Sequence, residues 1–364
     1  MAADDVPTSR SVSRPVPRFE PIETERLLLR PVRESDVDGL WERRNDPATS
    51  AYQAWAVPYS RDDAATLIAS ILAHDGVPPG DGWFQITVDD RSTGETLGDL
   101  ALHLTFAGRC AELGYTFAPA ARGRGVATEA TAALAEWCFD SVGVSRVSAQ
   151  MHPDNLASIR VAERVGMVFE GHTRNSFWLD HHDGTVENSD DWWYAMTRED
   201  WVAWRDRPNA TPDEIRLVEI GHENVRTVLR LATHRSQERF VATTATSLAD
   251  AFAPEPHEGH PIVAWARAIE ADGELVGFLM VAEPNAAAPE AYLWRLLVDR
   301  LHQRRGIGRR AVELVIDEIR SWSVPAIETS WVPGPGSPEP LYLSLGFEPT
   351  GAVEDGEVVG RLTL

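Results

Sequence analysis

The sequence predicts an α/β protein built from two tandem domains, and three observations support this prediction. The chain has 364 residues, enough for two domains that each bury a core of their own. A strand, a turn rich in arginine and glycine, and an amphipathic helix follow one another at 111–136 and again at 291–319. Around these two units, both halves show elements in the same order, β–α–α–β–β–β–α–β–α–β.

In the first half, β-prone and alternating residues predict the strands, and apolar residues at helical spacing predict the helices. The Arg91–Gly94 turn joins two strands as a hairpin, and a second hairpin with an acidic loop at Asp180–Asp191 closes this half. The predicted strands are 25–31, 83–88, 96–105, 111–117, 144–151 and 192–196, and the predicted helices are a first one after Ser35, then 62–74, 127–139 and one that ends at Gly166.

The boundary between the domains is predicted at 207–213, a linker with two prolines and almost no apolar residues. The first domain then spans 19–206 and the second 214–364, and residues 1–18, rich in Pro, Ser and Arg, form a disordered tail. Around the second strand–turn–helix unit, the second domain has predicted strands at 214–220, 262–270, 274–281 and 326–331 and predicted helices at 224–234 and 247–252.

The two turns have the composition of a phosphate-binding loop. Residues 122–127 (RGRGVA) open a helix, so unpaired backbone N–H groups point outward at the positive end of its dipole. Gly123 and Gly125 let an anion approach the backbone closely. The spacing lacks the Gly-Lys-Ser/Thr of a Walker loop and the three-glycine dinucleotide fingerprint, and it fits Arg/Gln-x-x-Gly-x-Gly/Ala. Residues 303–308 (QRRGIG) repeat this pattern.

Both stretches resemble the acyl-coenzyme A pyrophosphate loop of the GNAT superfamily of N-acetyltransferases. The β runs at 144–151 and 326–331, and the Gly-hydrophobic pairs at Gly166 and Gly346, are similar to that family too, so the resemblance extends from about Phe19 to the end of the chain. It implies a mixed central sheet flanked by helices in each domain, acetyl-coenzyme A as co-substrate and no metal. The first half resembles the Rim-type acetyltransferases of ribosomal-protein N-termini, and the second half resembles the polyamine and streptothricin acetyltransferases.

The resemblance also implies which residues contact the coenzyme. The backbone N–H groups of Phe117 and Val298 are expected at the thioester carbonyl. Asn155 matches a pantetheine contact, although an asparagine there is also a good helix cap. The expected loop contacts are Arg122, Gly123, Arg124, Gly125, Val126, Ala127 and Thr128 in the first domain and Gln303, Arg304, Arg305, Gly306, Ile307, Gly308 and Arg309 in the second.

Amide formation from a thioester needs a base for the acceptor ammonium, a donor for the oxyanion and a proton for the departing thiolate. Glu112, on the strand before the first loop, is the candidate base, acting through water; an exposed strand residue or an ion pair with Arg109 explains it equally well. Ser158 matches the Rim-type position for thiolate protonation, or it is a plain first-turn serine. The family's usual tyrosine is Ala162 here, but in the second half it is Tyr342, with core packing as the alternative. No base is predicted for the second half.

The net charge of −22 disfavours nucleic acid and favours cationic partners, although solubility alone explains it equally well. Cys110 and Cys138 suit a reducing cytoplasm, and the N-terminal segment has no apolar run for a membrane anchor. The pair His181-His182 lacks a further ligand at metal spacing. Aromatic residues and carboxylates, or else ordinary surface residues, are expected at the acceptor entrance: Tyr52, Trp55, Asp62, Asp63, Asp183, Glu187, Asp190 and Asp191.

The predicted function is direct transfer of an acetyl group from acetyl-coenzyme A to the primary amine of a cationic acceptor. The acceptor is a small amine, an amine-bearing antibiotic or a peptide N-terminus, and the expected role is detoxification or self-resistance. Two alternatives remain at this point: one catalytic half beside a pseudoenzyme, and a non-catalytic acyl-coenzyme A sensor or scaffold. Neither nucleic acid nor a membrane is an expected partner, and the chain is expected as a monomer with a pseudo-dimeric pair of domains or as a homodimer.

Overall fold

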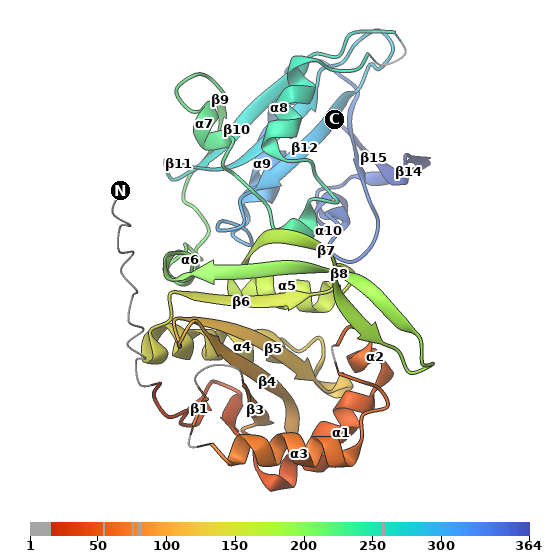
Figure 1. Cartoon of the computed structure of the whole chain (residues 1–364). Helices are drawn as coiled ribbons and strands as arrows, with labels where there is room; N and C mark the ends of the chain where they lie inside the picture. The colour runs from red at the N-terminus through yellow and green to blue at the C-terminus, as the bar shows by residue number, and fades with distance from the viewer. Residues whose placement is uncertain (1–15, 54, 75, 79–81, 257–258) are drawn as a thin grey trace, which may run out of the picture. The chain divides into compact units, whose positions relative to one another are not determined.

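The computed structural model describes residues 16–53, 55–74, 76–78, 82–256 and 259–364. It divides into two compact units, Met1–Arg205 and Asp206–Leu364. Each unit contains one mixed sheet flanked by helices, so the predicted α/β architecture of two tandem domains is confirmed (Figure 1). Most of the predicted tail, 1–18, lies outside the described residues. Within the described part of the chain, no helix combines the length and apolar character needed to cross a membrane.

The sheet of the first unit has eight strands in the order β1-β2-β3-β4-β5-β6-β8-β7, and only its β5–β6 pair is parallel among the described pairs. The strands are β1 (Ile22–Glu23), β2 (Leu27–Pro31), β3 (Trp83–Asp90), β4 (Thr96–Thr105), β5 (Cys110–Phe117), β6 (Arg146–Met151), β7 (Val168–Asp180) and β8 (Val186–Thr197). The helices are α1 (Val37–Asn45), α2 (Pro47–Ser50), α3 (Arg61–Leu72), α4 (Val126–Trp137), α5 (Leu156–Val165) and α6 (Arg198–Arg205).

Apolar faces attach the helices of the first unit to its sheet. Helix α4, which follows the first loop, buries Val126, Ala130 and Leu134 at helical spacing in the same core as the strands. Helix α1 is joined to β4 by a buried ion pair, in which Arg43 binds Asp99 at 2.8 Å. The loop helix therefore has a fixed position on the sheet that precedes it.

The sheet of the second unit has seven strands in the order β14-β15-β13-β12-β11-β10-β9, with β12 and β13 parallel. Alternate side chains of its central strands supply two cores, since Leu279 belongs to one and Phe278 to the other. The strands are β9 (Ile215–Glu219), β10 (Ala264–Ala271), β11 (Glu274–Ala282), β12 (Ala291–Val298), β13 (Ala326–Trp331), β14 (Glu348–Glu354) and β15 (Glu357–Thr363), and the helices are α7 (Val225–Val228), α8 (Thr244–Phe252), α9 (Ile307–Arg320) and α10 (Glu339–Ser344).

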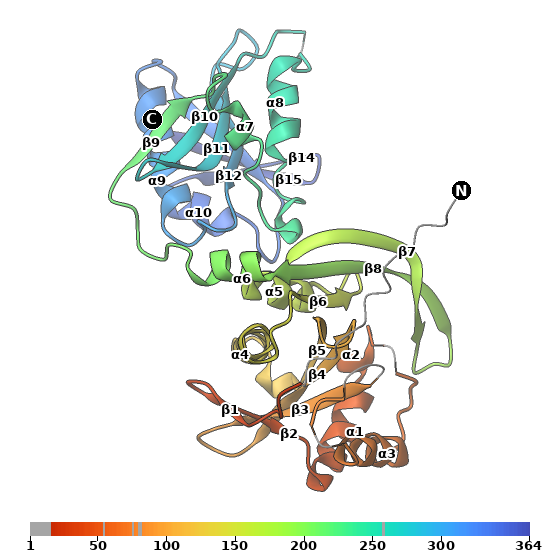
Figure 2. The ribbon, with the colours of Figure 1, turned by 60° about the vertical axis from the view of Figure 1, so that its left-hand side comes forward.

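Three local predictions are wrong. The segment Asp180–Asp191 is mostly strand, because β7 and β8 stay paired as far as Asp180 and Val186 and form a long ribbon (Figure 2). The helix predicted at 224–234 is a single turn, α7. Ser35 lies inside a turn of 3₁₀ helix at Glu34–Asp36 and does not cap α1. The segment Asp180–Asp191 is mostly strand because it pairs with a partner strand, and the local sequence carries little information about such pairing.

The central strands diverge in both units. Strands β5 and β6 pair over Cys110–Glu112, after which β5 continues alone toward the first loop. Strands β12 and β13 pair over Ala291–Leu293, and β12 then continues alone toward the second loop. A gap therefore opens in each sheet beside the strand that leads into the glycine turn.

Candidate active site

Backbone donors face the gap in both units. The N–H of Ala118 donates to the carbonyl of Leu97 at 2.9 Å, and hydrogen bonds alternate in direction along an antiparallel strand. The N–H of Phe117 therefore points away from β4, toward the gap. In the second unit Asp299 donates to Val276 at 2.8 Å, so the N–H of Val298 points into the gap there. Both strands thus direct a backbone N–H into the gap, and a donor of this kind can stabilise an oxyanion.

A glycine lies opposite each of these donors, and neither glycine was predicted from the sequence as part of the site. Gly98 pairs with Phe117, and Gly277 pairs with Val298. A Cβ on Gly98 would lie 2.4 Å from the carbonyl oxygen of Thr116, and one on Gly277 would lie 2.6 Å from that of Leu297. The two strands approach too closely for any other residue. A glycine inside the second hairpin strand of both halves was the available signal.

The first loop is held by residues outside the motif. Gly123 and Gly125 have φ values of +72° and +78°, which glycine adopts freely, and Gly125 is the N-cap of α4. The guanidinium of Arg122 binds Thr49 at 2.6 Å and Asp46 at 3.2 Å. The loop therefore keeps its shape through contacts with α2 and its N-cap residue as well as through its own glycines.

An acidic residue in the first turn of α4 pairs with an arginine that immediately precedes β2. Glu129 forms a salt bridge with Arg26 at 2.6 Å. The same arginine donates to the carbonyl of Arg124 at 2.9 Å, so it bridges the loop and the helix. A free carboxylate at this position would oppose a bound phosphate. The ion pair removes that conflict.

The second loop is fixed mainly by its own side chains. Gln303 donates to the carbonyl of Val298 at 3.0 Å and to Gln237 at 2.8 Å. Arg305 is buried, and it donates to the carbonyl of Ala210 at 2.8 Å and to His302 at 3.0 Å. The guanidinium of Arg305 is thus directed into the domain.

Three further residues shape the second loop. Arg304 has a φ of +65° and Gly306 one of +79°, so the chain turns sharply before α9. Arg309, in the first turn of α9, donates to the hydroxyl of Ser344 at the end of α10. Backbone N–H groups at this turn and the positive end of α9 form the kind of nest that binds phosphate.

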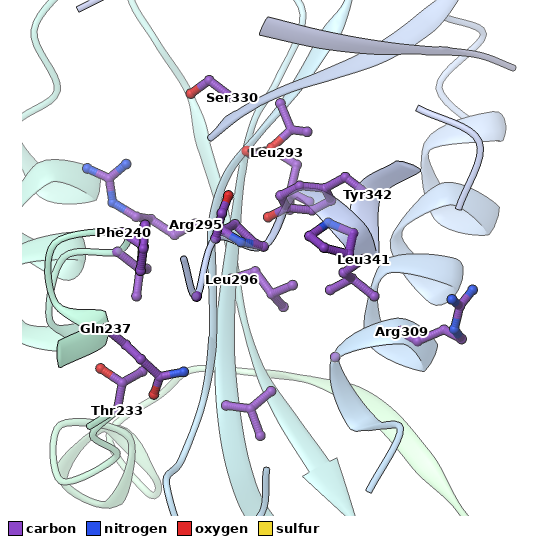
Figure 3. A pocket seen from close by; sticks show the side chains of 18 of the residues that line it. Thr233, Gln237, Phe240, Leu293, Arg295, Leu296, Arg309, Ser330, Leu341 and Tyr342 are labelled. Carbon is purple, nitrogen blue, oxygen red and sulfur yellow. Dashed lines mark hydrogen bonds between the residues drawn. The ribbon is translucent and has the colours of Figure 1, made fainter. Parts of the chain in front are cut away.

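A cavity of about 870 Å³ opens beside the second loop. Gly306 and the residues around it line one part, and Tyr342 of α10 and Leu293 of β12 line another. Figure 3 shows Tyr342 next to Leu293, with Ser330 toward one end and Gln237 and Thr233 toward the other. Acidic residues of the β14–β15 turn also line the cavity: Glu354, Asp355 and Glu357.

Tyr342 both packs in the core and lines the cavity, the two alternatives that the sequence left open. Its ring packs against Trp331 and Phe347, with centroid distances of 5.8 Å and 5.6 Å, and it also lines the cavity. Burial raises the pKa of Tyr342 to about 12, and a hydrogen bond with Thr329 opposes this shift. The phenol therefore keeps its proton at neutral pH and can donate it.

In the first unit Glu112 faces a histidine. Its carboxylate lies 3.9 Å from Nδ1 of His103, the residue opposite it on β4, so among the described residues its ion-pair partner is His103 and not Arg109. Burial raises the pKa of Glu112; His103 opposes this shift, and Asp191 adds to it. A carboxylate with a raised pKa is a better base near neutral pH.

Some of the acceptor-entrance residues meet around His152. Tyr52 stacks on its ring at 4.8 Å, Glu187 lies 4.0 Å from its Nε2, and Asp191 interacts with it electrostatically. Burial raises the pKa of Asp191. The other candidates have separate places: Trp55 donates to the carbonyl of Arg44, Asp63 accepts from Ser60 in the capping box of α3, Asp183 binds Thr185 in the hairpin turn, and Asp190 binds His172. Asp62 is exposed in the first turn of α3.

Asn155 and Ser158 start helix α5. The side-chain oxygen of Asn155 accepts a hydrogen bond from the N–H of Ser158 at 3.1 Å, which is the helix-cap interaction. Tyr115, on β5, donates to the carbonyl of Ser158 at 2.8 Å. The contacts of Asn155 with pantetheine and of Ser158 with the thiolate stay predictions. The amide N–H₂ of Asn155 and the hydroxyl of Ser158 are the groups that would make them.

Comparison with known proteins agrees with this geometry. Residues 26–168 match the family model described as "Acetyltransferase (GNAT) domain", and residues 228–347 match the one described as "Acetyltransferase (GNAT) family". Together the two matches cover well over half of the chain, so the chain belongs to the GNAT acetyltransferases and carries two GNAT domains in tandem. The protein is an acetyl-coenzyme A-dependent N-acetyltransferase.

Several relatives have the size of one of these domains. The "Uncharacterized N-acetyltransferase YnaD" of Bacillus subtilis is 26% identical over 184 residues, which cover 50% of this chain and 98% of the relative. The "Putative ribosomal N-acetyltransferase YdaF" of the same species is 26% identical over 190 residues, covering 50% and 90%. The crystal structure of a GNAT-family acetyltransferase from Bacillus anthracis superposes with a TM-score of 0.42 at 24% identity, covering 50% of this chain and 99% of that one.

Proposed function

We propose that the second domain acetylates the primary amine of a small cationic acceptor. The observation that carries this proposal is that the second loop, Tyr342 and the acidic β14–β15 turn all line one cavity. Acetyl-coenzyme A fits the loop end, where the glycine turn and the start of α9 suit a pyrophosphate. An ammonium group suits the other end, because Glu354, Asp355 and Glu357 supply negative charge there.

The residues of the second domain suit direct attack. The free amine attacks the thioester carbonyl, and the N–H of Val298 stabilises the oxyanion that forms. The neutral phenol of Tyr342 then donates a proton to the departing thiolate. The resemblance of this half to polyamine and streptothricin acetyltransferases supports an acceptor with several amino groups.

We assign the same reaction to the first domain, with Glu112 as its base and Phe117 as the oxyanion donor. Ser158 takes the role of the acid here, since this domain has alanine at the position of the usual tyrosine. Tyr52 and Asp191 beside His152 offer an aromatic face and a carboxylate to a cation. The name of the relative YdaF and the Rim-type resemblance support a peptide N-terminus as the acceptor of this domain.

Detoxification or self-resistance is the role that fits an enzyme with two amine-acetylating sites. The cytoplasm is the compartment proposed for it, where Cys110 and Cys138 remain free thiols as they are in the structure. In the rival proposals one or both domains are not catalytic. A pseudoenzyme domain would bind coenzyme without turnover, and a sensor would show no turnover in either domain.

The test is thiol release from acetyl-coenzyme A across polyamines, amine-bearing antibiotics and peptides with free N-termini. The intact chain is compared with Gly125→Glu and Gly306→Glu, which place a carboxylate in the first or second phosphate nest. We expect cationic amines to be acetylated and each variant to lose one class of acceptor. Preference for a neutral or anionic acceptor would refute the proposal, and no turnover with any amine would support the sensor.

Salt tests the role of charge at the first acceptor site. The Debye length shrinks from about 10 Å at 0.1 M to about 3 Å at 1 M salt, so the KM of the acceptor should rise with ionic strength. Replacing Glu187 by Gln and Asp191 by Asn should raise that KM and flatten its salt dependence. Replacing Asp183 and Asp190 by Asn removes the same charge from the same hairpin at residues that bind Thr185 and His172, and serves as the matched control. Equal effects of both pairs would contradict an acceptor site at His152.

A further inference from the structure

We propose that Tyr292, Ser330 and Glu357 form a proton path that removes the ammonium proton of the acceptor in the second domain. The inference rests on the proposed function, acetylation of a cationic amine by this domain. It supplies the base that the sequence did not reveal there, since Leu293 occupies the place on β12 that Glu112 occupies on β5.

Three strands bring the three side chains together at one end of the cavity. Tyr292 lies on β12, Ser330 on β13 and Glu357 at the start of β15, and all three line the cavity together with Tyr342. The hydroxyl oxygens of Tyr292 and Ser330 are 2.7 Å apart. The hydroxyl of Ser330 donates in turn to the Glu357 carboxylate. Figure 3 places Ser330 at the end of the cavity away from Gln237.

The chemistry of the three groups fixes the direction of these bonds. An ionised carboxylate only accepts hydrogen bonds, and a serine hydroxyl has one hydrogen to give. That hydrogen points to Glu357, so the oxygen of Ser330 must accept the hydrogen of Tyr292. The lone pairs of the Tyr292 oxygen that remain are thus available to the cavity. The chain is oriented to carry a proton from the cavity to Glu357.

Burial and the neighbouring charges keep Tyr292 protonated. Burial raises the pKa of Tyr292; Ser330 opposes this shift, Glu357 adds to it, Arg295 on the same strand opposes it, and Glu354 on β14 adds to it. Tyr342 lies on the other side and is neutral, so Tyr292 also stays a neutral phenol that passes a proton on as it receives one. The β14–β15 turn is exposed, which lets Glu357 release its proton to water.

The proton transfer balances. One N–H bond of the ammonium breaks and its electron pair stays on nitrogen; Tyr292 receives that proton and gives its own to Ser330, which gives its own to the Glu357 carboxylate. The neutral amine then attacks the thioester. Tyr342 protonates the thiolate and regains a proton from the attacking nitrogen as the amide forms. The net reaction releases one proton, the one that Glu357 passes to water.

The test uses the full chain with Gly125→Glu, so that only the second domain turns over, and spermidine as the acceptor. The variants are Tyr292→Phe, Ser330→Ala and Glu357→Gln, and kcat/KM is measured by thiol release from pH 6.5 to 10. At pH 7 each variant should lose about 10²-fold or more, the contribution of a general base. Calorimetry should show unchanged affinity for coenzyme A, because none of the three residues belongs to the second loop.

The pH profile separates a proton path from a structural role. An alkyl ammonium has a pKa of about 10.4, so the free amine becomes roughly tenfold more abundant with each pH unit below that value. A defect of about 10²-fold at pH 7 should therefore shrink by about tenfold per pH unit and nearly vanish by about pH 9. A merely structural role would give the same loss at every pH.

Glu328→Gln is the matched control. Glu328 lies on β13, two residues before Ser330, and its carboxylate is 3.6 Å from Arg361 and outside the cavity lining. It removes the same charge from the same sheet, and its profile should follow the parent chain. Loss that is constant with pH, or full activity at pH 7 in Tyr292→Phe, would overturn the proton path alone. A parent chain that acetylates no amine would overturn the proposed function, and the proton path with it.

Discussion

Tyr342→Phe separates the two roles that the structure gives to this residue. The phenol lines the cavity, and its ring packs against Trp331 and Phe347. Phenylalanine keeps the ring and its packing and removes only the hydroxyl. If the hydroxyl is the acid that protonates the thiolate, kcat of the second domain should fall by about 10²–10⁴-fold, the usual contribution of a general acid.

The expected cost in stability is small and depends on pH. At pH 8 the variant loses the hydrogen bond with Thr329, about 1 kcal/mol. Burial raises the pKa of Tyr342 to about 12, above the value of about 10 for an unfolded tyrosine. Relative to high pH, where the phenol is ionised in both states, this shift corresponds to about 3 kcal/mol of stability, which is present below pH 10 and is lost as the pH rises through 12. By pH 11 the wild type has lost about 1 kcal/mol of it, which equals the hydrogen bond that the variant lacks, so the variant should then be as stable as the wild type.

Two measurements test these numbers. Thiol release with a polyamine, in the background of Gly125→Glu, gives kcat for the second domain, and calorimetry gives its affinity for coenzyme A, which should change little. Urea unfolding at pH 8 and at pH 11 gives the difference in free energy of unfolding between variant and wild type.

The outcomes are distinct. Unaltered kcat with a good acceptor would assign Tyr342 to core packing and refute the acid role. A loss of kcat accompanied by a loss of several kcal/mol at pH 8 would show that the phenol holds the domain together, because removal of one hydroxyl should not cost that much.

Two further predictions concern glycines. Calorimetry should find two coenzyme A sites per chain, and Gly125→Glu or Gly306→Glu should each remove one, because a carboxylate would enter the phosphate nest; a single site in the unmodified chain would favour a pseudoenzyme domain. Gly98→Ala and Gly277→Ala should each lower the free energy of unfolding of their own domain by about 1–3 kcal/mol, because the new Cβ would lie 2.4 Å or 2.6 Å from a carbonyl oxygen of the facing strand. Unchanged denaturant midpoints would show that these strands have room.

Much of the fold follows from local patterns in the sequence. The loop helices α4 and α9 begin where the glycine turn predicts, because the N-cap glycines Gly125 and Gly306 need a left-handed backbone that few other residues adopt. The hairpin of β3 and β4 was found from a short turn and alternating residues. In these elements the residues that determine the local structure lie within a few positions of it in the sequence.

Contacts between distant residues were not predictable in this way. The base proposed for the second domain depends on Ser330 and Glu357, which lie on different strands, and the shape of the second loop depends on Arg305 reaching Ala210. In the first domain, Glu112 faces His103 because β4 and β5 pair in one register. A register shift of one residue would face Glu112 with another side chain, and no residue near it in sequence reports the register.

The contacts that hold the two loops affect how the coenzyme binds. Arg26 and Asp46 hold the first loop, and Gln237 and Ala210 hold the second, although none of the four belongs to the repeated motif. Ordering a long side chain on binding costs about 0.5–1.5 kcal/mol, and here folding has already met that cost. The bound shape of each loop is therefore a property of the whole domain. If the six motif residues were transplanted into another scaffold, the contacts that preorganise the loop would be absent. The transplanted loop should therefore bind coenzyme A more weakly.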